Sequence, residues 1–458
     1  MTVNKLSALF DNDMLKKYDS RGPRYTSYPT ALEFEESFEN DEFEACIKSS
    51  INRDLSLYIH IPFCHSLCYY CGCNKIVTRH PEKADRYLDM LIQEMAYRAS
   101  QLKDREVSQI HLGGGTPSFL SEAQISRLML WVRRLFKIKQ RTEVSIEIDP
   151  RNLDLNYVDH LANEGFNRMS IGVQDITAKV QIAINRQQSS GFIKQLIERA
   201  HLVGFDSVNI DLIYGLPHQT EQSFAESLKV INGFNADRIS LFSYAHLPDR
   251  FAAQRKIKDT WLPSAAAKLG LMQMAMAHFL ATGYDMIGMD HFAKPTDELA
   301  IAMRSGQLHR NFQGYTTQGD TDLLGLGVSA ISSLGHCYSQ NHKSLRDYDT
   351  AIAEQGHAIE KGKVLSEDDM VRRYVIAELM CNLNLSKPKV NEYFEVDFDQ
   401  YFADSIKVLQ PLIKDGLVNN DLTHLSVAPE ARLIIRTVCM AFDAYLPEAA
   451  QARYSKVI

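Results

Sequence analysis

Four cysteines crowd into ten residues of the segment HIPFCHSLCYYCGCNK, at Cys64, Cys68, Cys71 and Cys73. The first three have a CxxxCxxC spacing, and three thiolates so close together can hold one [4Fe-4S] cubane whose fourth iron has no protein ligand. An iron left open in this way can bind and activate a small molecule. Two alternatives stay open: a structural zinc site, which usually draws four ligands from two separated pairs, and thiols that bind no metal.

Further polar groups follow apolar runs of the chain. Gly113, Gly114 and Gly115 with Thr116 come directly after VSQIHL, where the backbone must turn sharply or approach a ligand. Glu147 closes EVSIEIDP, Gln174 closes RMSIGVQ and Asp211 lies in SVNIDLIYGLP. Buried polar groups need partners. Neighbouring backbone can satisfy any one of them, but three on successive apolar runs favour a shared site.

The elements that position these groups alternate between two periodicities. Short apolar runs predict strands, and helical segments separate them, as with Leu88, Leu91 and Met95 on one face. A parallel connection needs a crossover of this length, so the pattern predicts an α/β fold, a partial (β/α)6 barrel of parallel strands. In such barrels the chemistry gathers at the carboxyl ends of the strands. The six predicted strands are LSLYIHI, VSQIHL, EVSIEI, RMSIGV, SVNIDLIY and RISLFSY.

The chain of 458 residues is long enough for more than one core. We expect an N-terminal extended arm over residues 1–50, because the tract GPRYTSYPT fits neither helical nor strand periodicity. The partial-barrel catalytic domain is predicted over 51–365. A small, mainly helical C-terminal domain with one hairpin-like stretch, LVNNDLTHLSV, is predicted over 366–458.

The composition excludes several classes of partner. A net charge of −7 offers no general hold on phosphate backbones, so no nucleic acid is expected. Asp11, Asp13 and Lys16 interrupt the first stretch, which lacks the apolar core of a secretory signal. Nowhere do about eighteen apolar residues run together, so no membrane insertion is expected. We therefore predict a cytoplasmic protein, whose crowded cysteines suggest ligation rather than disulfides.

The cysteine spacing with a ring aromatic, Tyr70, before the third cysteine and GGGTP further on resembles the radical S-adenosylmethionine (SAM) superfamily. The closer resemblance, over essentially the whole chain, is to the family of oxygen-independent coproporphyrinogen III oxidases. The stretches that carry it are GPRYTSYPTALEF, YIHIPFCHSLCYYCGCNKIVTR, HLGGGTP, GFNRMSIGVQD, NIDLIYGLP, YAHLP, FAAQRKIKD, IGMDHFA, LHRNFQGYTTQGDTDLLGLGVSAIS and the terminal SKVI.

The resemblance implies an oxidoreductase of haem (porphyrin) biosynthesis with a [4Fe-4S] cluster and SAM bound at two sites. One electron from the reduced cluster would cleave SAM to methionine and a 5′-deoxyadenosyl radical. The reaction would remove carbon dioxide from two propionates of coproporphyrinogen III and leave the vinyl groups of protoporphyrinogen IX. The implied partners are this substrate, a reducing electron donor such as a flavodoxin-type protein and an electron acceptor that the sequence does not identify. The family also implies a monomer.

Carried over position by position, the resemblance makes Cys64, Cys68 and Cys71 the metal ligands. It implies catalytic roles for Tyr58, Cys73 and Glu147, and the haem chaperones related to this family generally lack a cysteine at position 73. Many members carry phenylalanine where this chain has Tyr70, and we expect the change to be tolerated. The cluster-bound SAM would be lined by Tyr58, Gly114, Glu147 and Ile331, and the second SAM by Tyr70, Gly115, Thr116, Gln174, Arg186, Asp211 and Ala245.

Substrate binding is predicted from chemical complementarity alone. Coproporphyrinogen carries four carboxylates around an apolar macrocycle, which calls for arginines beside aromatic surface. Arg24 and Arg310 are the candidates, and both lie in tracts rich in tyrosine or phenylalanine.

Three other readings of the chain remain. A haem-carrying chaperone on the same fold would bind haem without forming a product, and a SAM-dependent enzyme of anaerobic haem breakdown would consume it. Cys73 and the tract GPRYTSYPT favour the oxidase over both. A zinc-stabilised binding protein is the most distant alternative, which metal and sulfide analysis would settle.

Overall fold

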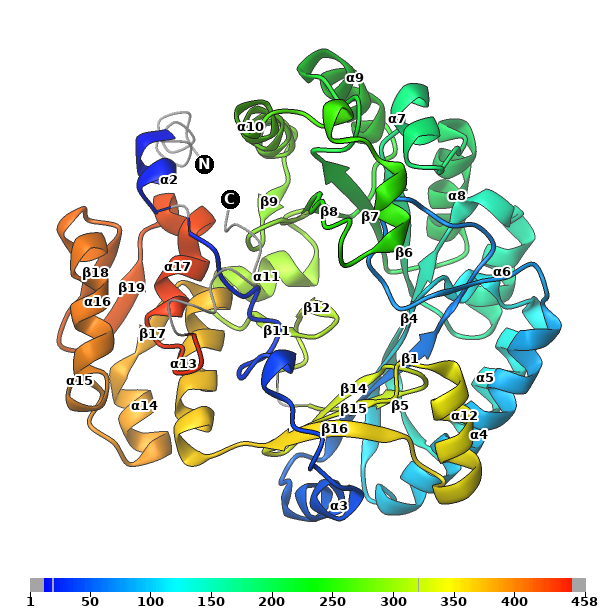
Figure 1. Cartoon of the computed structure of the whole chain (residues 1–458), viewed down its shortest axis with the longest axis horizontal. Helices are drawn as coiled ribbons and strands as arrows, with labels where there is room; N and C mark the ends of the chain where they lie inside the picture. Colours follow the sequence, from blue (N-terminus) through cyan, green and yellow to red (C-terminus); the bar gives the residue numbers. More distant parts are fainter. Residues whose placement is uncertain (1–11, 19, 320, 447–458) are drawn as a thin grey trace. The chain divides into compact units, whose positions relative to one another are not determined.

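The computed structural model describes residues 12–18, 20–319 and 321–446. Two compact units make up the chain, and each combines segments that are far apart in sequence (Figure 1). Unit 1 consists of Met1–Glu33, Met276–Gly319 and Leu365–Ile458, and unit 2 of Phe34–Ala275 and Asp320–Val364. The linear domain boundaries at residues 50 and 365 stay a prediction, since the units are discontinuous. The terminal SKVI lies outside the described residues.

The centre of unit 2 is a sheet whose parallel strands follow chain order, and helices lie along one side of it (Figure 1). All six predicted strands and their parallel pairing are confirmed. They are β1 (Asp54–Ile61), β4 (Glu106–Gly114), β5 (Lys137–Ile148), β6 (Arg168–Gln174), β7 (Ser207–Tyr214) and β8 (Arg238–Ser243).

The helices between these strands bury one face each. On α4 (Glu82–Gln101) the predicted stripe of Leu88, Leu91 and Met95 is fully buried. Hydrogen bonds from capping side chains fix where several helices begin; Ser121, for example, accepts from the Gln124 backbone N–H before α5. The remaining crossover helices are α5 (Glu122–Leu135), α6 (Leu155–Asn163), α7 (Ala178–Ala183), α8 (Ser190–Leu202) and α9 (Glu221–Asn232).

The sheet continues beyond β1 with strands that the periodicity did not predict. Strand β13 (Asp322–Leu326) pairs parallel with β1, and β14 (Ile331–Leu334), β15 (Cys337–Asn341) and β16 (Ile359–Val364) follow antiparallel. Helix α12 (Leu345–Gln355) connects the last two. These strands are short and interrupted by glycine and serine, so they lack the long apolar runs of the barrel strands.

Two helices lie within residues 1–50, the segment for which an extended arm is predicted. Residues Asn12–Tyr18 form α2, and Asn40–Ser49 form α3. Phe43, Cys46 and Ile47 are buried on one face of α3, a helical spacing within a segment of mostly polar composition. Because most residues of this segment are polar, the sequence pattern did not indicate this narrow apolar face.

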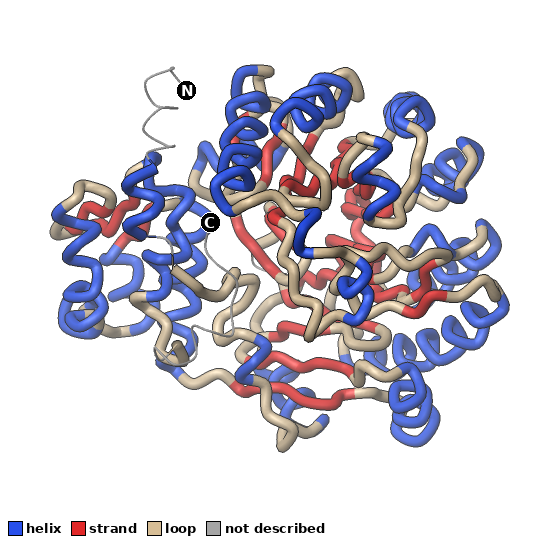
Figure 2. Tube along the Cα trace, turned by 45° about the horizontal axis from the view of Figure 1, so that its top comes forward, coloured by secondary structure: helices blue, strands red, loops and turns tan. Residues whose placement is uncertain are grey.

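Unit 1 contains the C-terminal helices. Helices are blue and strands are red in Figure 2. The mainly helical C-terminal part and its hairpin, where β18 (Val418–Asn420) pairs antiparallel with β19 (His424–Val427), are confirmed. Strand β17 (Asn384–Ser386) completes this small sheet. The helices of this C-terminal part are α13 (Glu367–Asn382), α14 (Lys387–Phe394), α15 (Phe398–Tyr401), α16 (Ala403–Lys414) and α17 (Ile435–Met440).

The middle segment adds short elements to unit 1. Helix α10 (Ala265–Ala281) leads into it. The antiparallel pairs are β9 (Asp285–Met286) with β10 (His291–Ala293) and β11 (His309–Asn311) with β12 (Gly314–Thr316), and α11 (Glu298–Ser305) lies between them in sequence. Within the described ranges, every helix falls short of the length and apolarity that crossing a bilayer requires.

Candidate active site

The cysteine loop follows β1 directly and is fastened at both ends. Cys64 closes the short strand β2 (Phe63–Cys64), which pairs with β3 (Ile76–Val77), and the Thr78 backbone N–H donates to the Cys64 carbonyl at 3.0 Å. Cys64 and Cys68 are buried, Cys71 is half-buried and Cys73 is exposed. The predicted ligands therefore lie on one short loop at the carboxyl end of β1.

No three His, Cys, Asp or Glu side chains among the described residues stand close enough to hold one metal ion. A structural zinc site takes its four ligands on a single ion. A cubane differs, since each thiolate binds a different iron. The fit of this loop to a cluster therefore depends on what surrounds the thiols.

Two arginines point at the Cys68 thiol. Arg151 Nη2 lies 3.4 Å and Arg186 Nη1 3.5 Å from Cys68 Sγ. Both guanidinium groups also bind Asp149, with Nη to Oδ2 distances of 2.5 and 3.2 Å. Metal binds the thiolate form of cysteine, and the two guanidinium groups lie where they can balance its negative charge. The sequence predicted Arg186 but missed Arg151, whose only signal was its place two residues after a strand-end aspartate.

Cys71 and Cys73 interact with each other. A hydrogen bond from the Cys73 side chain lowers the pKa of Cys71 to about 6, and the charge of Lys75 assists. The same hydrogen bond to Cys71 raises the pKa of Cys73. Burial also raises the pKa of the Cys64 thiol to about 11. Of these thiols, Cys71 loses its proton most readily, whereas a proton would have to leave Cys64 before it could bind metal.

Three of the four residues predicted around the cluster-bound SAM lie together. The Tyr58 ring stacks on His111 at 5.9 Å between centroids, and His111 Nε2 lies 3.5 Å from Glu147 Oε1. Glu147 Oε2 accepts from the Gly114 backbone N–H at 3.2 Å. The structure thus joins Tyr58, Gly114 and Glu147 across β1, β4 and β5. Ile331 begins β14, two strands from β1.

Gly114 has to be glycine at this position. Its φ is +118°, a conformation that side chains disfavour. A Cβ there would stand 2.6 Å from the ring of His60, which itself accepts or donates a 3.0 Å hydrogen bond with Tyr58 Oη. His60 was missed by the sequence reading, which took it for an ordinary strand residue.

Several residues predicted for the second SAM also surround the cysteine loop. Thr116 Oγ1 lies 3.3 Å from Cys64 Sγ. The neighbouring Gly115 N–H donates to the Ile61 carbonyl at 2.8 Å. A Cβ at Gly172 would stand 2.7 Å from Arg186 Nη2 and 2.8 Å from Gln174 Nε2, so both side chains lie over that glycine.

Tyr70 and Ala245 are joined through a residue that the sequence reading did not single out. Gln254 Nε2 donates to the Tyr70 carbonyl at 2.9 Å and to the Ala245 carbonyl at 3.1 Å, and its Oε1 accepts from the Leu247 N–H. Asp211 binds Ser170 and Asn209 instead, at 3.3 and 2.8 Å.

Replacing Gln254 by leucine is expected to lower the free energy of unfolding by about 2–4 kcal/mol, because three backbone groups lose their buried partner. Urea unfolding of the metal-free chain measures this loss. Gln187→Leu is the matched control, since Gln187 is exposed. Equal midpoints for the two variants would contradict the bridging role of Gln254.

The candidate substrate arginines lie in unit 1. Arg24 Nη2 pairs with Asp290 Oδ2 at 3.0 Å, and Arg310 Nη1 donates to the Arg24 carbonyl at 3.3 Å. The Arg310 guanidinium stands 5.0 Å from the centre of the Tyr315 ring. Burial alone would raise the pKa of Asp290, but His291 and the two arginines lower it overall. The predicted pair of arginines therefore meets beside an aromatic ring and one carboxylate.

The chain resembles known proteins over its whole length. The radical SAM superfamily model matches residues 58–231, and the HemN C-terminal domain model matches residues 365–434. The oxygen-independent coproporphyrinogen III oxidase of Escherichia coli (strain K12) is 54% identical over 459 residues, covering all of both chains. The enzyme of that name from Pseudomonas aeruginosa is 44% identical, over 98% of this chain and 99% of its own.

A solved structure extends this similarity to the fold. Coproporphyrinogen III oxidase (HemN) from Escherichia coli, described as a radical SAM enzyme, superimposes with a TM-score of 0.92. The match covers 95% of this chain and 99% of that one. Such agreement confirms the predicted partial-barrel fold class.

A radical SAM enzyme, with a [4Fe-4S] cluster and SAM as cofactors, is the class that the fold and the family match define. More closely, the chain belongs to the family of oxygen-independent coproporphyrinogen III oxidases, the oxidoreductases of porphyrin biosynthesis. The predicted family, enzyme class and cofactors are thereby confirmed.

Proposed function

We propose that this chain oxidatively decarboxylates two propionates of coproporphyrinogen III to the vinyl groups of protoporphyrinogen IX. The observation that supports this most directly is the Arg151–Asp149–Arg186 group on Cys68, placed at the same strand edge as Tyr58 and Glu147. The bound cluster and SAM supply a carbon radical strong enough to take hydrogen from an unactivated C–H bond. The chain's own residues bind and orient the cluster and SAM, and they neutralise the charge around these cofactors.

Each group of side chains has a distinct task in this proposal. Cys64, Cys68 and Cys71 hold the cluster, and the two guanidinium groups compensate its negative charge. Glu147, fixed by the Gly114 N–H, is an acceptor for the ammonium group of SAM. Tyr58 supplies a ring face for the same cofactor. Ile331 is proposed to line the same cluster-bound SAM. The second SAM is proposed beside Thr116, Gln174 and Arg186, and the rest of its lining is proposed to come from Tyr70, Gly115, Asp211 and Ala245.

Cys73 is proposed to take part in catalysis rather than in metal binding. It is the one exposed cysteine among the eight that the described residues contain, and its backbone N–H donates to Cys71 Sγ at 3.4 Å. The raised pKa keeps its thiol protonated at neutral pH, so it can give up a proton or a hydrogen atom.

Arg24 and Arg310 are proposed to hold substrate carboxylates. Arg310 Nε is buried and has no hydrogen-bond partner among the described residues, so one donor is left for a ligand. Its guanidinium plane lies over Tyr315, the combination of cation and ring that an anionic macrocycle requires.

Replacing Arg310 by alanine is expected to raise the KM for coproporphyrinogen III about 10- to 100-fold, because a charge-assisted hydrogen bond is lost. Arg24→Ala should act in the same direction, while iron content stays unchanged in both. Arg304→Ala is the matched control, since Arg304 lies in unit 1 and binds Asp285 at the surface. An unchanged KM in Arg310→Ala would remove this role.

The organisation of the whole protein follows from the same proposal. We propose a cytoplasmic monomer reduced by a flavodoxin-type donor. None of the described cysteines forms a disulfide, which suits a reducing compartment. We keep the C-terminal domain boundary at residue 365, which is where the matched C-terminal model and a segment of unit 1 begin. The N-terminal arm and the barrel domain are proposed over 1–50 and 51–365.

An anaerobic assay tests the function. The reconstituted protein receives reductant, SAM, coproporphyrinogen III and an electron-accepting cell extract, and protoporphyrinogen and 5′-deoxyadenosine are measured. Both products should form, and both should be lost in Cys64→Ser. Deoxyadenosine without the porphyrin product would leave the radical chemistry intact and overturn the substrate assignment. Neither product, with an intact cluster and tight haem binding, would identify a chaperone.

A further inference from the structure

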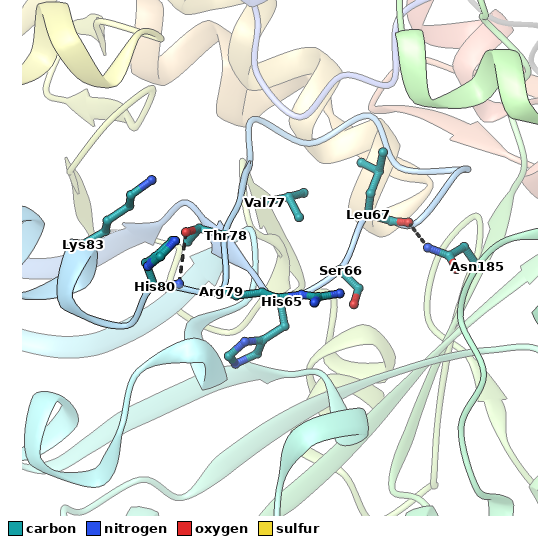
Figure 3. Close-up of a pocket in the computed structure, with 9 residues that line it drawn as sticks. All are labelled: His65, Ser66, Leu67, Val77, Thr78, Arg79, His80, Lys83 and Asn185. Atoms are coloured by element: carbon teal, nitrogen blue, oxygen red, sulfur yellow. Dashed lines mark hydrogen bonds between the residues drawn. The ribbon is translucent and has the colours of Figure 1, made fainter.

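A basic pocket lies on the outer side of the cysteine loop in unit 2 (Figure 3). Its volume is about 480 Å³. Its lining comes from the loop itself, from β3 and the segment that leads into the start of α4, and from Asn185, which follows α7. None of its lining residues is Asp or Glu. The reaction proposed above leaves this pocket unused.

The positive charge of the pocket comes from Arg79 and Lys83. Both are exposed, and neither has an ion pair among the described residues. His80 is paired with Glu82 at 2.9 Å. Two unpaired cations therefore stand together on a chain whose net charge is −7.

Exposed apolar side chains border these cations. Val77, which lines the pocket, is 45% exposed, and Ile182 on α7 is 61% exposed. Ile182 lies one turn before Asn185 in the pocket wall. Exposed apolar side chains flanked by charge are typical of a transient protein interface. Binding of a small anion would not involve these apolar side chains.

Residues that line the pocket make hydrogen bonds to the loop that carries the proposed cluster ligands. The Thr78 N–H donates to the Cys64 carbonyl, and Asn185 Nδ2 donates to the Leu67 carbonyl at 2.8 Å. The Asn185 carbonyl accepts from Arg151, which in turn donates to Cys68 Sγ. A partner seated here would thus be separated from the metal site by the thickness of a single loop.

We propose that this pocket docks an acidic one-electron carrier protein that reduces the cluster. The inference rests on the proposed function, which requires one electron for each SAM cleaved. That electron leaves the reduced flavin of the carrier and enters the cluster, and no bond of the chain forms or breaks. Arg79 and Lys83 bind acidic side chains at the rim of the carrier, while Val77 and Ile182 contact its apolar surface.

The test uses the reconstituted holoenzyme and a reduced flavodoxin of acidic surface. Arg79→Glu/Lys83→Glu is compared with Lys103→Glu/Arg141→Glu, which makes the same charge change on two exposed residues. Lys103 lies beyond the far end of α4, about 30 Å from the helix start near Lys83. Calorimetry measures flavodoxin binding at low salt, and electron paramagnetic resonance measures the rate of cluster reduction.

We expect the pocket variant to bind flavodoxin about tenfold more weakly and to lose most of the salt dependence of binding. The control variant should stay within about twofold of the unchanged protein. Reduction by titanium(III) citrate, which needs no docking, should be equally fast in all three proteins. Equal flavodoxin affinity in the pocket variant, or an equal loss in the control, would overturn the docking site.

Failure of the docking inference can be distinguished from failure of the proposed function. If titanium(III)-reduced protein forms protoporphyrinogen but the pocket variant keeps its affinity, only the docking inference falls. Binding and cluster reduction are measured without coproporphyrinogen, so the docking result also stands if the substrate assignment fails.

Discussion

Cys68→Ser is expected to lose the [4Fe-4S] cluster and to lower SAM cleavage to the background of the assay. The proposed cluster has three protein ligands, and Cys68 is the one whose sulfur two guanidinium groups contact. A serine hydroxyl is a much poorer ligand for iron, and the arginines would then face each other with less negative charge between them. The measurement is iron and sulfide content, the visible absorbance of the cluster and the yield of 5′-deoxyadenosine.

A graded variant separates ligation from charge compensation. Arg151→Leu keeps all three thiols and removes one donor to Cys68, so cluster affinity should fall about 10- to 100-fold rather than vanish. Cys381→Ser, at a buried cysteine of α13, should leave the cluster intact. Full cluster content in Cys68→Ser would exclude this residue as a ligand.

Asp149→Asn is expected to lower the free energy of unfolding by about 3–5 kcal/mol, because it leaves two largely buried arginines without their shared carboxylate. Burial alone would raise the pKa of Asp149, but Arg186 and Arg151 outweigh it, so the pKa is lowered below its ordinary 3.8. A lowered pKa means that the folded state holds the proton less tightly than the unfolded chain. The stabilisation is therefore complete above about pH 3.8 and disappears as the pH falls through the lower folded value.

Urea unfolding of the metal-free chain at several pH values tests this prediction. The difference between the unchanged protein and Asp149→Asn should be constant near neutral pH and should shrink in acid. Asp404→Asn, which breaks an exposed ion pair with Lys407, is the control and should change little at any pH. A difference that grows in acid would contradict the lowered pKa of Asp149.

The barrel could be predicted from sequence because its strands are buried runs separated by amphipathic helices. Strands such as Ser207–Tyr214 are buried along most of their length, so most of their residues are apolar. Strand β14 is different, since only alternate residues of Ile331–Leu334 are buried. Helix α3 was missed for a related reason, because three buried residues among charged neighbours give a weak helical signal.

The site was predictable where residue type alone reveals chemistry. Cysteines at Cys64, Cys68 and Cys71 have few other uses at that spacing, whereas Arg151, His60 and Gln254 are residue types found on every surface. Their roles arise from strand register and loop geometry, which place Arg151 beside Cys68 and Gln254 between two carbonyls. Such contacts join residues 83 and 184 positions apart, a separation that sequence patterns do not encode.

The discontinuous makeup of unit 1 has a consequence for synthesis on the ribosome. Arg436 donates to the Gly22 and Pro23 carbonyls, and Tyr25 Oη donates to Asp443 at 2.9 Å. During synthesis, Gly22, Pro23 and Tyr25 therefore lack these partners until the C-terminal residues 436–443 leave the ribosome. At about 5–20 residues per second the wait lasts tens of seconds. The strands that carry the cysteine loop are complete well before then. Iron–sulfur assembly factors would therefore meet a finished metal loop on a nascent chain whose other unit is still unfolded.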